Sequence, residues 1–114
     1  MDHKELQSQL KATISLASEA ESFLKHVAEH RPLDAFFRGH LEYLAQQGRR
    51  NLEELEKATA SGQDRELLNV ERMHAARVVT ILEQMQTVSP DDPGLRKKQQ
   101  DLAAVQSELQ RVTP

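Results

Sequence analysis

Two side chains that could do chemistry together lie three residues apart, Glu71 and His74. Residues at this spacing are neighbours on an α-helix, so a carboxylate and an imidazole can touch there. At about 100° of turn per residue, both lie near the middle of the apolar face of segment 67–88. Charged side chains are rarely fully buried unless they are paired. We therefore expect a buried salt bridge or hydrogen-bonded polar layer that sets the register of the neighbouring helices.

A carboxylate and an imidazole that face inward can also share one metal ion. The sequence Glu71-Arg72-Met73-His74 resembles the Glu-x-x-His motif of the ferritin-like di-metal carboxylate proteins. Those proteins use two such motifs and a glutamate from each of two further helices, whereas this chain has one motif. The resemblance implies a transition-metal site that Glu54, or a symmetry-related subunit, completes. A metal-binding bundle is therefore the alternative to a non-enzymatic protein without a cofactor.

A second pattern of chemical interest lies at residues 26–30. The sequence His-Val-Ala-Glu-His matches the H-x-x-E-H pattern of the inverzincin metalloproteases, in which two histidines grip zinc. Because Val27 lies on the buried side of its predicted helix, His26 should point toward water. The inverzincin family also requires a further acidic ligand from a far larger domain. We expect a solvated helix end here, and we assign no catalytic residue in the chain.

The elements that would position these residues are helices. Leu, Ala, Glu, Gln, Lys and Arg dominate, only 4% of residues are aromatic, and apolar residues recur at intervals of three and four. The predicted helices cover about 2–30, 32–60, 64–88 and 93–111. Pro32, Ser61-Gly62 and the segment 89–94 provide the turns between them.

The fold class predicted from this pattern is all-α, an antiparallel up-down-up-down four-helix bundle, as a single domain over residues 1–114. The alternative is a swapped dimer in which the first two helices form one long rod through Pro32. Counting outward from the turns in the bundle places three segments level with His74. These segments are 48–51, 13–17 and 106–109.

The second predicted helix carries polar residues along one margin of its apolar stripe. These residues are His40, Gln47, Asn51 and Glu54. They form either the wet edge of a packed helix or a rim for a partner helix. Phe36 and Tyr43, on either side of His40, are the surface aromatic residues most expected at such a contact.

The fourth predicted helix has apolar residues in a narrow seam of the coiled-coil kind. The seam includes Leu95, Leu102 and Leu109. Such a seam can close a bundle or pair with another chain. We therefore favour an oligomerisation or protein–protein interaction module, whose partner is its own copy in a homodimer or another helical protein.

Charge and composition narrow the classes of partner. The net charge is -3, from 15 basic and 18 acidic residues that are spread evenly along the chain. Without a basic face, we expect neither nucleic acid nor an anionic membrane as the partner. The chain has no cysteine and no apolar run of about 18 residues, which agrees with a cytoplasmic protein.

Overall fold

The computed structural model describes residues 1–30 and 32–112, and over these residues it contains four α-helices and no strand. The helices are α1 (His3–His30), α2 (Asp34–Lys57), α3 (Gln63–Met85) and α4 (Leu95–Arg111). Together they form an elongated body of 47 × 23 × 17 Å. The prediction of an all-helical chain with four helices is confirmed. In the described part of the chain, no helix has the length and apolar character needed to cross a bilayer.

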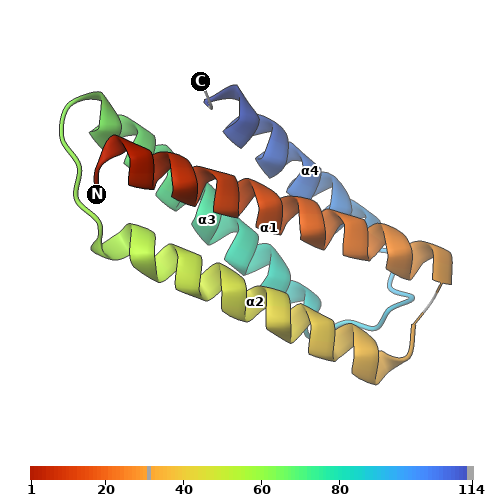
Figure 1. Cartoon of the computed structure of the whole chain (residues 1–114). Coiled ribbons are helices and arrows are strands. Elements are labelled where there is room, and N and C mark those ends of the chain that lie inside the picture. Colours follow the sequence, from red (N-terminus) through yellow and green to blue (C-terminus); the bar gives the residue numbers. More distant parts are fainter. Residues whose placement is uncertain (31, 113–114) are drawn as a thin grey trace.

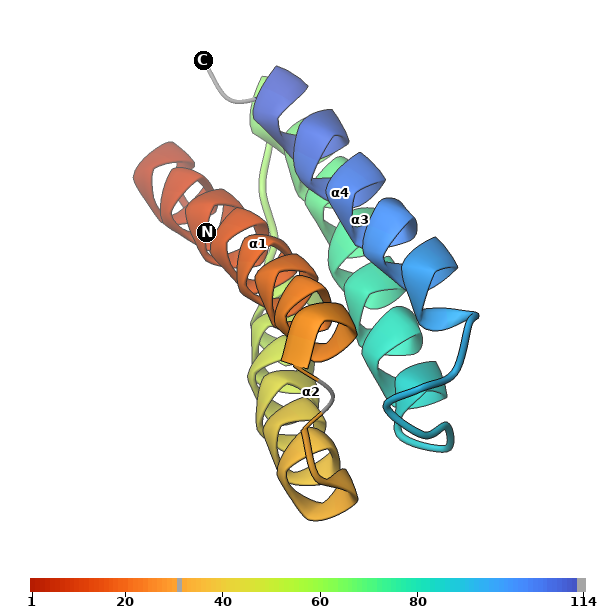
Figure 2. The same cartoon turned by 90° about the vertical axis from the view of Figure 1, so that its right-hand side faces the viewer.

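Helices α1 and α2 lie on one side of the molecule and α3 and α4 on the other (Figures 1 and 2). The most extensive packing crosses between these sides, where α2 lies against α3 and α1 lies against α4. Helix α1 also contacts α3, whereas the backbones of α2 and α4 do not approach each other closely. Helices α1 and α3 therefore each contact all three of the other helices.

Polar contacts tie the ends of neighbouring helices together. Arg38, near the start of α2, donates a hydrogen bond of 2.7 Å to the backbone carbonyl of Gln86, which follows α3. Lys98, in the first turn of α4, bonds to the side chain of Gln84 near the end of α3. The beginnings of α2 and α4 therefore both lie beside the end of α3.

Gly48 allows close packing in the middle of the molecule. A Cβ atom at this position would lie 3.1 Å from Cγ2 of Val79 on α3 and 3.3 Å from Cδ2 of Leu16 on α1. These distances are shorter than ordinary van der Waals contact between carbon atoms. The absence of a side chain at Gly48 therefore lets α2 approach both neighbours at the same level.

The buried apolar residues fall into two clusters. The larger cluster fills most of the bundle and takes side chains from all four helices. The smaller cluster lies toward the start of α1 and consists of Leu6, Leu55, Leu68 and Ala75. Glu71 lies between Leu68 and Ala75 on the same face of α3, because residues three and four apart share one side of a helix.

The connection between α2 and α3 differs from the prediction. Helix α2 ends at Lys57 rather than at about residue 60, and Ala58 is already extended, with φ -74° and ψ 149°. Gly62 then adopts a φ of 63°, which L-residues with side chains rarely accept, just before α3 begins. The chain therefore uses an extended five-residue link, 58–62, instead of a tight turn (Figure 1).

This link displaces the layer that we predicted beside His74. Gly48 lies beside Val79 and Leu82 of α3, well beyond His74. The extended link changes which residues of α2 and α3 lie side by side. Each residue of α3 lies beside a residue of α2 that comes later in the sequence than the one expected from a tight turn. The predicted neighbourhood of Gly48 and His74 is therefore wrong.

The remaining helix boundaries follow the sequence signals with small differences. Helix α1 ends at His30 and α2 begins at Asp34, so Pro32 separates two helices that pack on each other. The rod through Pro32 that the swapped-dimer alternative required is not formed. Helix α3 ends at Met85, and α4 begins at Leu95, because the segment 86–94 forms turns instead of extending either helix.

Candidate functional site

Glu71 is completely buried, and neither carboxylate oxygen has a hydrogen-bond partner among the described residues. His74 does not pair with it. The Nδ1 atom of His74 lies 2.9 Å from the backbone carbonyl oxygen of Val70, one turn earlier in the same helix, and the residue is partly exposed. The Nδ1 atom of His74 therefore has its hydrogen-bond partner within α3. The predicted contact between Glu71 and His74 is absent.

Burial raises the pKa of Glu71 to about 7, because the apolar surroundings penalise the charged form and no partner compensates for lost hydration. The group therefore changes its ionisation near neutral pH. This property follows from an isolated carboxyl group in the smaller apolar cluster, and not from a polar layer.

The structure does not assemble the predicted metal site. Glu54 is exposed and lines a groove between α1 and α2, whereas Glu71 faces the interior from α3. Among residues 1–30 and 32–112, no three His, Cys, Asp or Glu side chains are grouped as metal ligands. Glu54, Glu71 and His74 therefore do not form one ligand set within the chain.

The histidines near the end of α1 are exposed, as the helical pattern predicted for His26. The rings of His26 and His30 stack on each other, with centroids 4.4 Å apart and planes inclined by 14°. Val27 between them is buried. The H-x-x-E-H segment is thus a solvated end of α1 with one residue in the core.

The apolar seam of α4 is buried inside the molecule. Leu102 and Leu109 are fully buried in the larger cluster, and Leu95 is nearly so. Helix α4 packs on α1 and α3 through this face. The closed molecule therefore offers none of these three leucines to a partner, and an interface must use other residues.

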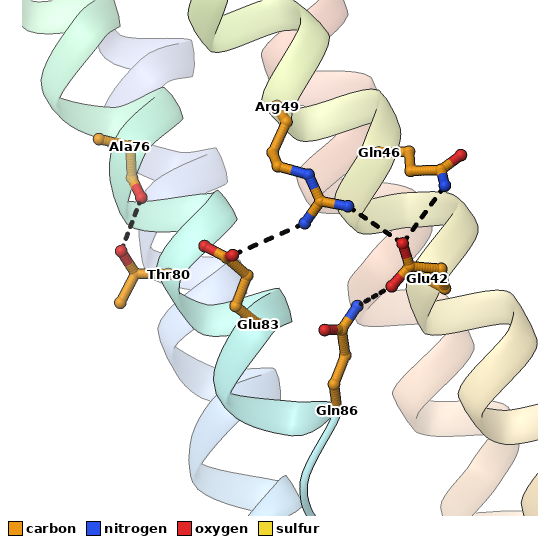
Figure 3. Close-up of polar contacts among 7 residues, drawn as sticks. All are labelled: Glu42, Gln46, Arg49, Ala76, Thr80, Glu83 and Gln86. Atoms are coloured by element: carbon orange, nitrogen blue, oxygen red, sulfur yellow. Dashed lines mark hydrogen bonds and ion pairs between the residues drawn. The ribbon is translucent and has the colours of Figure 1, made fainter.

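One margin of α2 is occupied by contacts with α3 (Figure 3). The guanidinium of Arg49 lies 3.1 Å from the carboxylate of Glu42 and 3.6 Å from that of Glu83 on α3. Gln86 donates a 2.7 Å hydrogen bond to the other oxygen of Glu42. The charges along this margin therefore already have partners within the molecule.

The other margin of α2 carries a row of three rings, Phe36, His40 and Tyr43, which we call the aromatic strip; Phe36 and Tyr43 are exposed and His40 is partly buried. The ring centroids of Phe36 and His40 are 6.1 Å apart, and those of His40 and Tyr43 are 6.0 Å apart. Phe23 of α1 is buried behind them, 4.3 Å from the His40 ring. Phe36 and Tyr43 are 55% and 51% exposed. Phe23 therefore supports the aromatic strip from the interior, and Phe36 and Tyr43 face solvent.

A groove continues from the aromatic strip along the same boundary between α1 and α2, and we call it the α1/α2 groove. Its α1 wall includes the small residues Ala12 and Ser15, and its α2 wall begins at Tyr43 and continues through Gln47 to Glu54. Three residues of the polar margin predicted on the second helix, Gln47, Asn51 and Glu54, thus form one side of a surface groove, whereas His40 does not line it.

Charged residues of the α1/α2 groove lack ion-pair partners among residues 1–30 and 32–112. Arg50 and Glu54 of α2 and Glu19 of α1 line the groove. None of the three takes part in an ion pair with another described residue. This contrasts with Arg49, the immediate neighbour of Arg50. The α1/α2 side of the molecule therefore combines exposed rings, a hollow and unpaired charges of both signs.

The chain was compared with protein-family models, curated proteins and solved structures, and no match was found.

Proposed function

We propose that this protein is a non-enzymatic oligomerisation module that associates with its own copy through the aromatic strip. The observation that carries the proposal is the exposure of Phe36 and Tyr43 in a row of rings supported by Phe23. Aromatic side chains are enriched at protein–protein contacts. Rings that are already packed lose little conformational freedom when a partner covers them. The strip therefore has the chemistry and the rigidity of an interface.

The fold proposed for the module is the antiparallel up-down-up-down four-helix bundle. The contacts of Arg38 with Gln86 and of Lys98 with Gln84 support it, since they bring the beginnings of α2 and α4 to the end of α3. The burial of the α4 seam supports it as well, because α4 then completes the bundle and leaves α2 to meet the partner.

The proposed partner is a protein rather than nucleic acid or a membrane surface, and the proposed location is the cytoplasm. Exposed rings beside single charges of both signs suit a protein surface, whereas binding to phosphate groups depends on clustered Lys and Arg. The α1/α2 groove contains one basic and two acidic residues, Arg50, Glu19 and Glu54. The lack of cysteine in the sequence agrees with a reducing compartment.

The test is the concentration dependence of mass, measured by sedimentation equilibrium. The wild-type protein is expected to associate, and the double variant F36S/Y43S is expected to remain monomeric while keeping its helical circular dichroism. The matched control is Met73→Ser, because Met73 is an apolar side chain of α3 that is 62% exposed away from the strip. Wild-type protein that stays monomeric up to the highest soluble concentration would overturn the proposal.

A further inference from the structure

The aromatic strip and the α1/α2 groove follow each other along one boundary, with Tyr43 at their junction. The strip projects, because Phe36 and Tyr43 are each more than half exposed. Ala12 and Ser15 on α1 have small side chains, which leave space in the groove. If a second copy is rotated by 180°, its aromatic strip faces the α1/α2 groove of the first copy, and its groove faces the strip of the first copy. A two-fold axis produces that relation between two copies of one chain.

We propose that the α1/α2 side docks on a second copy of this chain, with the two α2 helices antiparallel and Gln47 at the two-fold axis. This inference rests on the proposed self-association and adds its geometry. The occupants of each α1/α2 groove are then His40 and Tyr43 from the aromatic strip of the other copy.

The spacing of residues around Gln47 supports this register. Tyr43 lies four residues before Gln47, and Asn51 lies four residues after it. His40 lies seven residues before, and Glu54 seven after. Four and seven residues are close to one and two helical turns, so these side chains share one side of α2. In an antiparallel pair, each residue faces the one at the same distance beyond the axis.

The residues that meet in this register are chemically matched. His40 of one copy meets Glu54 of the other, which provides a carboxylate for the imidazole. Tyr43 enters the α1/α2 groove beside Asn51 of the other copy. Arg50, three residues after the axis, comes next to the Tyr43 ring of the other copy, on which a guanidinium can stack.

The axis itself is occupied by an amide that can pair with its own copy. Gln47 carries both a hydrogen-bond donor and an acceptor, so two copies of it can bond to each other across a two-fold axis. The groove charges Glu19, Arg50 and Glu54 form no ion pair with another residue that the structure describes, so no such pair competes with these contacts. A face of like charges would repel its copy, whereas this groove carries both signs.

Disulfide formation tests the register directly, because the chain has no cysteine of its own. The variant Gln47→Cys should form a disulfide-linked dimer under mild oxidation. The control Met73→Cys places an exposed thiol on α3, away from the proposed contact. We expect at least about tenfold faster linkage for Q47C than for M73C, since the dimer holds the two thiols at high effective concentration.

A mixture of two variants tests the direction of the helices. H40C mixed with E54C should give the mixed disulfide, whereas each variant alone should link slowly. Rapid linkage of H40C to itself would indicate parallel helices and would overturn the inference. If wild-type protein dimerises but Q47C links no faster than M73C, the inference fails and the proposed self-association stands. If wild-type protein is monomeric, the proposed function fails as well.

Discussion

The Nε atom of Arg72 on α3 donates a hydrogen bond of 2.7 Å to the backbone carbonyl oxygen of Leu55 on α2. The same guanidinium donates to the carbonyl oxygen of Glu56 at 3.5 Å and to that of Ala58. Carbonyl groups in the last turn of a helix have no partner within the helix. One arginine therefore caps the end of α2 from a neighbouring helix and holds the link 58–62 against α3.

Replacement of Arg72 by Met should lower the free energy of unfolding by about 1 to 3 kcal/mol, because the hydrogen bonds from a charged donor to the carbonyl groups at the end of α2 are lost. Urea denaturation followed by circular dichroism measures the change. Arg65→Met is the control, since Arg65 is an exposed residue of α3 whose side chain makes no hydrogen bond or ion pair with the described residues. Equal stability of R72M and R65M would show that the cap contributes nothing.

Stability should depend on pH through Glu71. Burial raises the pKa of Glu71 from its ordinary value of 4.5 to about 7, so the folded state binds this proton more tightly than the unfolded state. The contribution of the proton to stability is complete below about pH 4.5 and is lost as pH rises through 7. The expected loss by pH 8 is roughly 3 kcal/mol, from about 1.4 kcal/mol for each pH unit between the two pKa values.

The variant Glu71→Gln tests this dependence, because glutamine is isosteric and does not ionise. The free energy of unfolding, measured in urea from pH 4.5 to 8, should fall less steeply for E71Q than for the wild type. Glu54→Gln serves as the control, since Glu54 is exposed on α2. The same pH slope in the wild type and E71Q would contradict the raised pKa.

Two glycines of α2 should respond oppositely to substitution by alanine. At Gly39 a Cβ atom would meet nothing within 4 Å, so G39A should stabilise the protein by about 0.5 to 1 kcal/mol through helix propensity. At Gly48 the new Cβ atom meets stiff, β-branched Val79 at 3.1 Å, so the gain in propensity should be cancelled or reversed.

Thermal unfolding of the two alanine variants measures the difference between these sites. The larger substitution Gly48→Leu should lower the free energy of unfolding by about 1 to 3 kcal/mol or more, as overpacked cores do. G48A that stabilises the protein as much as G39A would show that the helices at this level can separate without cost.

The α4 seam should behave as core and not as interface. Leu102 is fully buried, so Leu102→Ala should cost about 2 to 5 kcal/mol. Leu33→Ala is the matched control, because Leu33 is 82% exposed and the same truncation should change stability by less than about 0.5 kcal/mol. Chemical denaturation measures both changes. A small cost at Leu102 would mean that α4 is loosely attached.

The local elements could be predicted from the sequence because their signals are local. Apolar residues that recur every three or four positions predict that Val27 lies in the core and His26 in solvent, and the structure confirms both. Pro32 and Gly62 lie in the connections that flank α2. Each of these statements depends on residues within a few turns of one another.

The relations between helices could not be predicted in the same way. Which residues of α2 and α3 lie side by side depends on the path of the link 58–62. Counting residues outward from the turn assumes a tight connection, whereas the link is extended. Arg72 contacts carbonyl groups 14 to 17 residues earlier, and nothing in the spacing of these residues reveals the contact. His74 satisfies its Nδ1 within its own helix, which periodicity does not reveal.

The candidate site was predicted in part. The sequence predicts Phe36 and Tyr43 as surface aromatic residues near His40, and the structure arranges the three rings in one row, in which Phe36 and Tyr43 are exposed and His40 is partly buried. Phe23, which supports that row, comes from α1 and did not stand out from the other apolar residues of its helix. The α1/α2 groove depends on two helices at once, so neither sequence segment shows it.

The division of the apolar interior into a large and a small cluster means that the molecule does not unfold from every part with equal ease. The small cluster has only four buried apolar side chains, and the buried carboxyl group of Glu71, between Leu68 and Ala75 on α3, has no hydrogen-bond partner among the described residues. Transient opening should therefore start where α2 ends and α3 begins, and amide hydrogens there should exchange with solvent before those near Gly48. Alkaline conditions should widen that difference, since each ionisation of Glu71 favours the opened form.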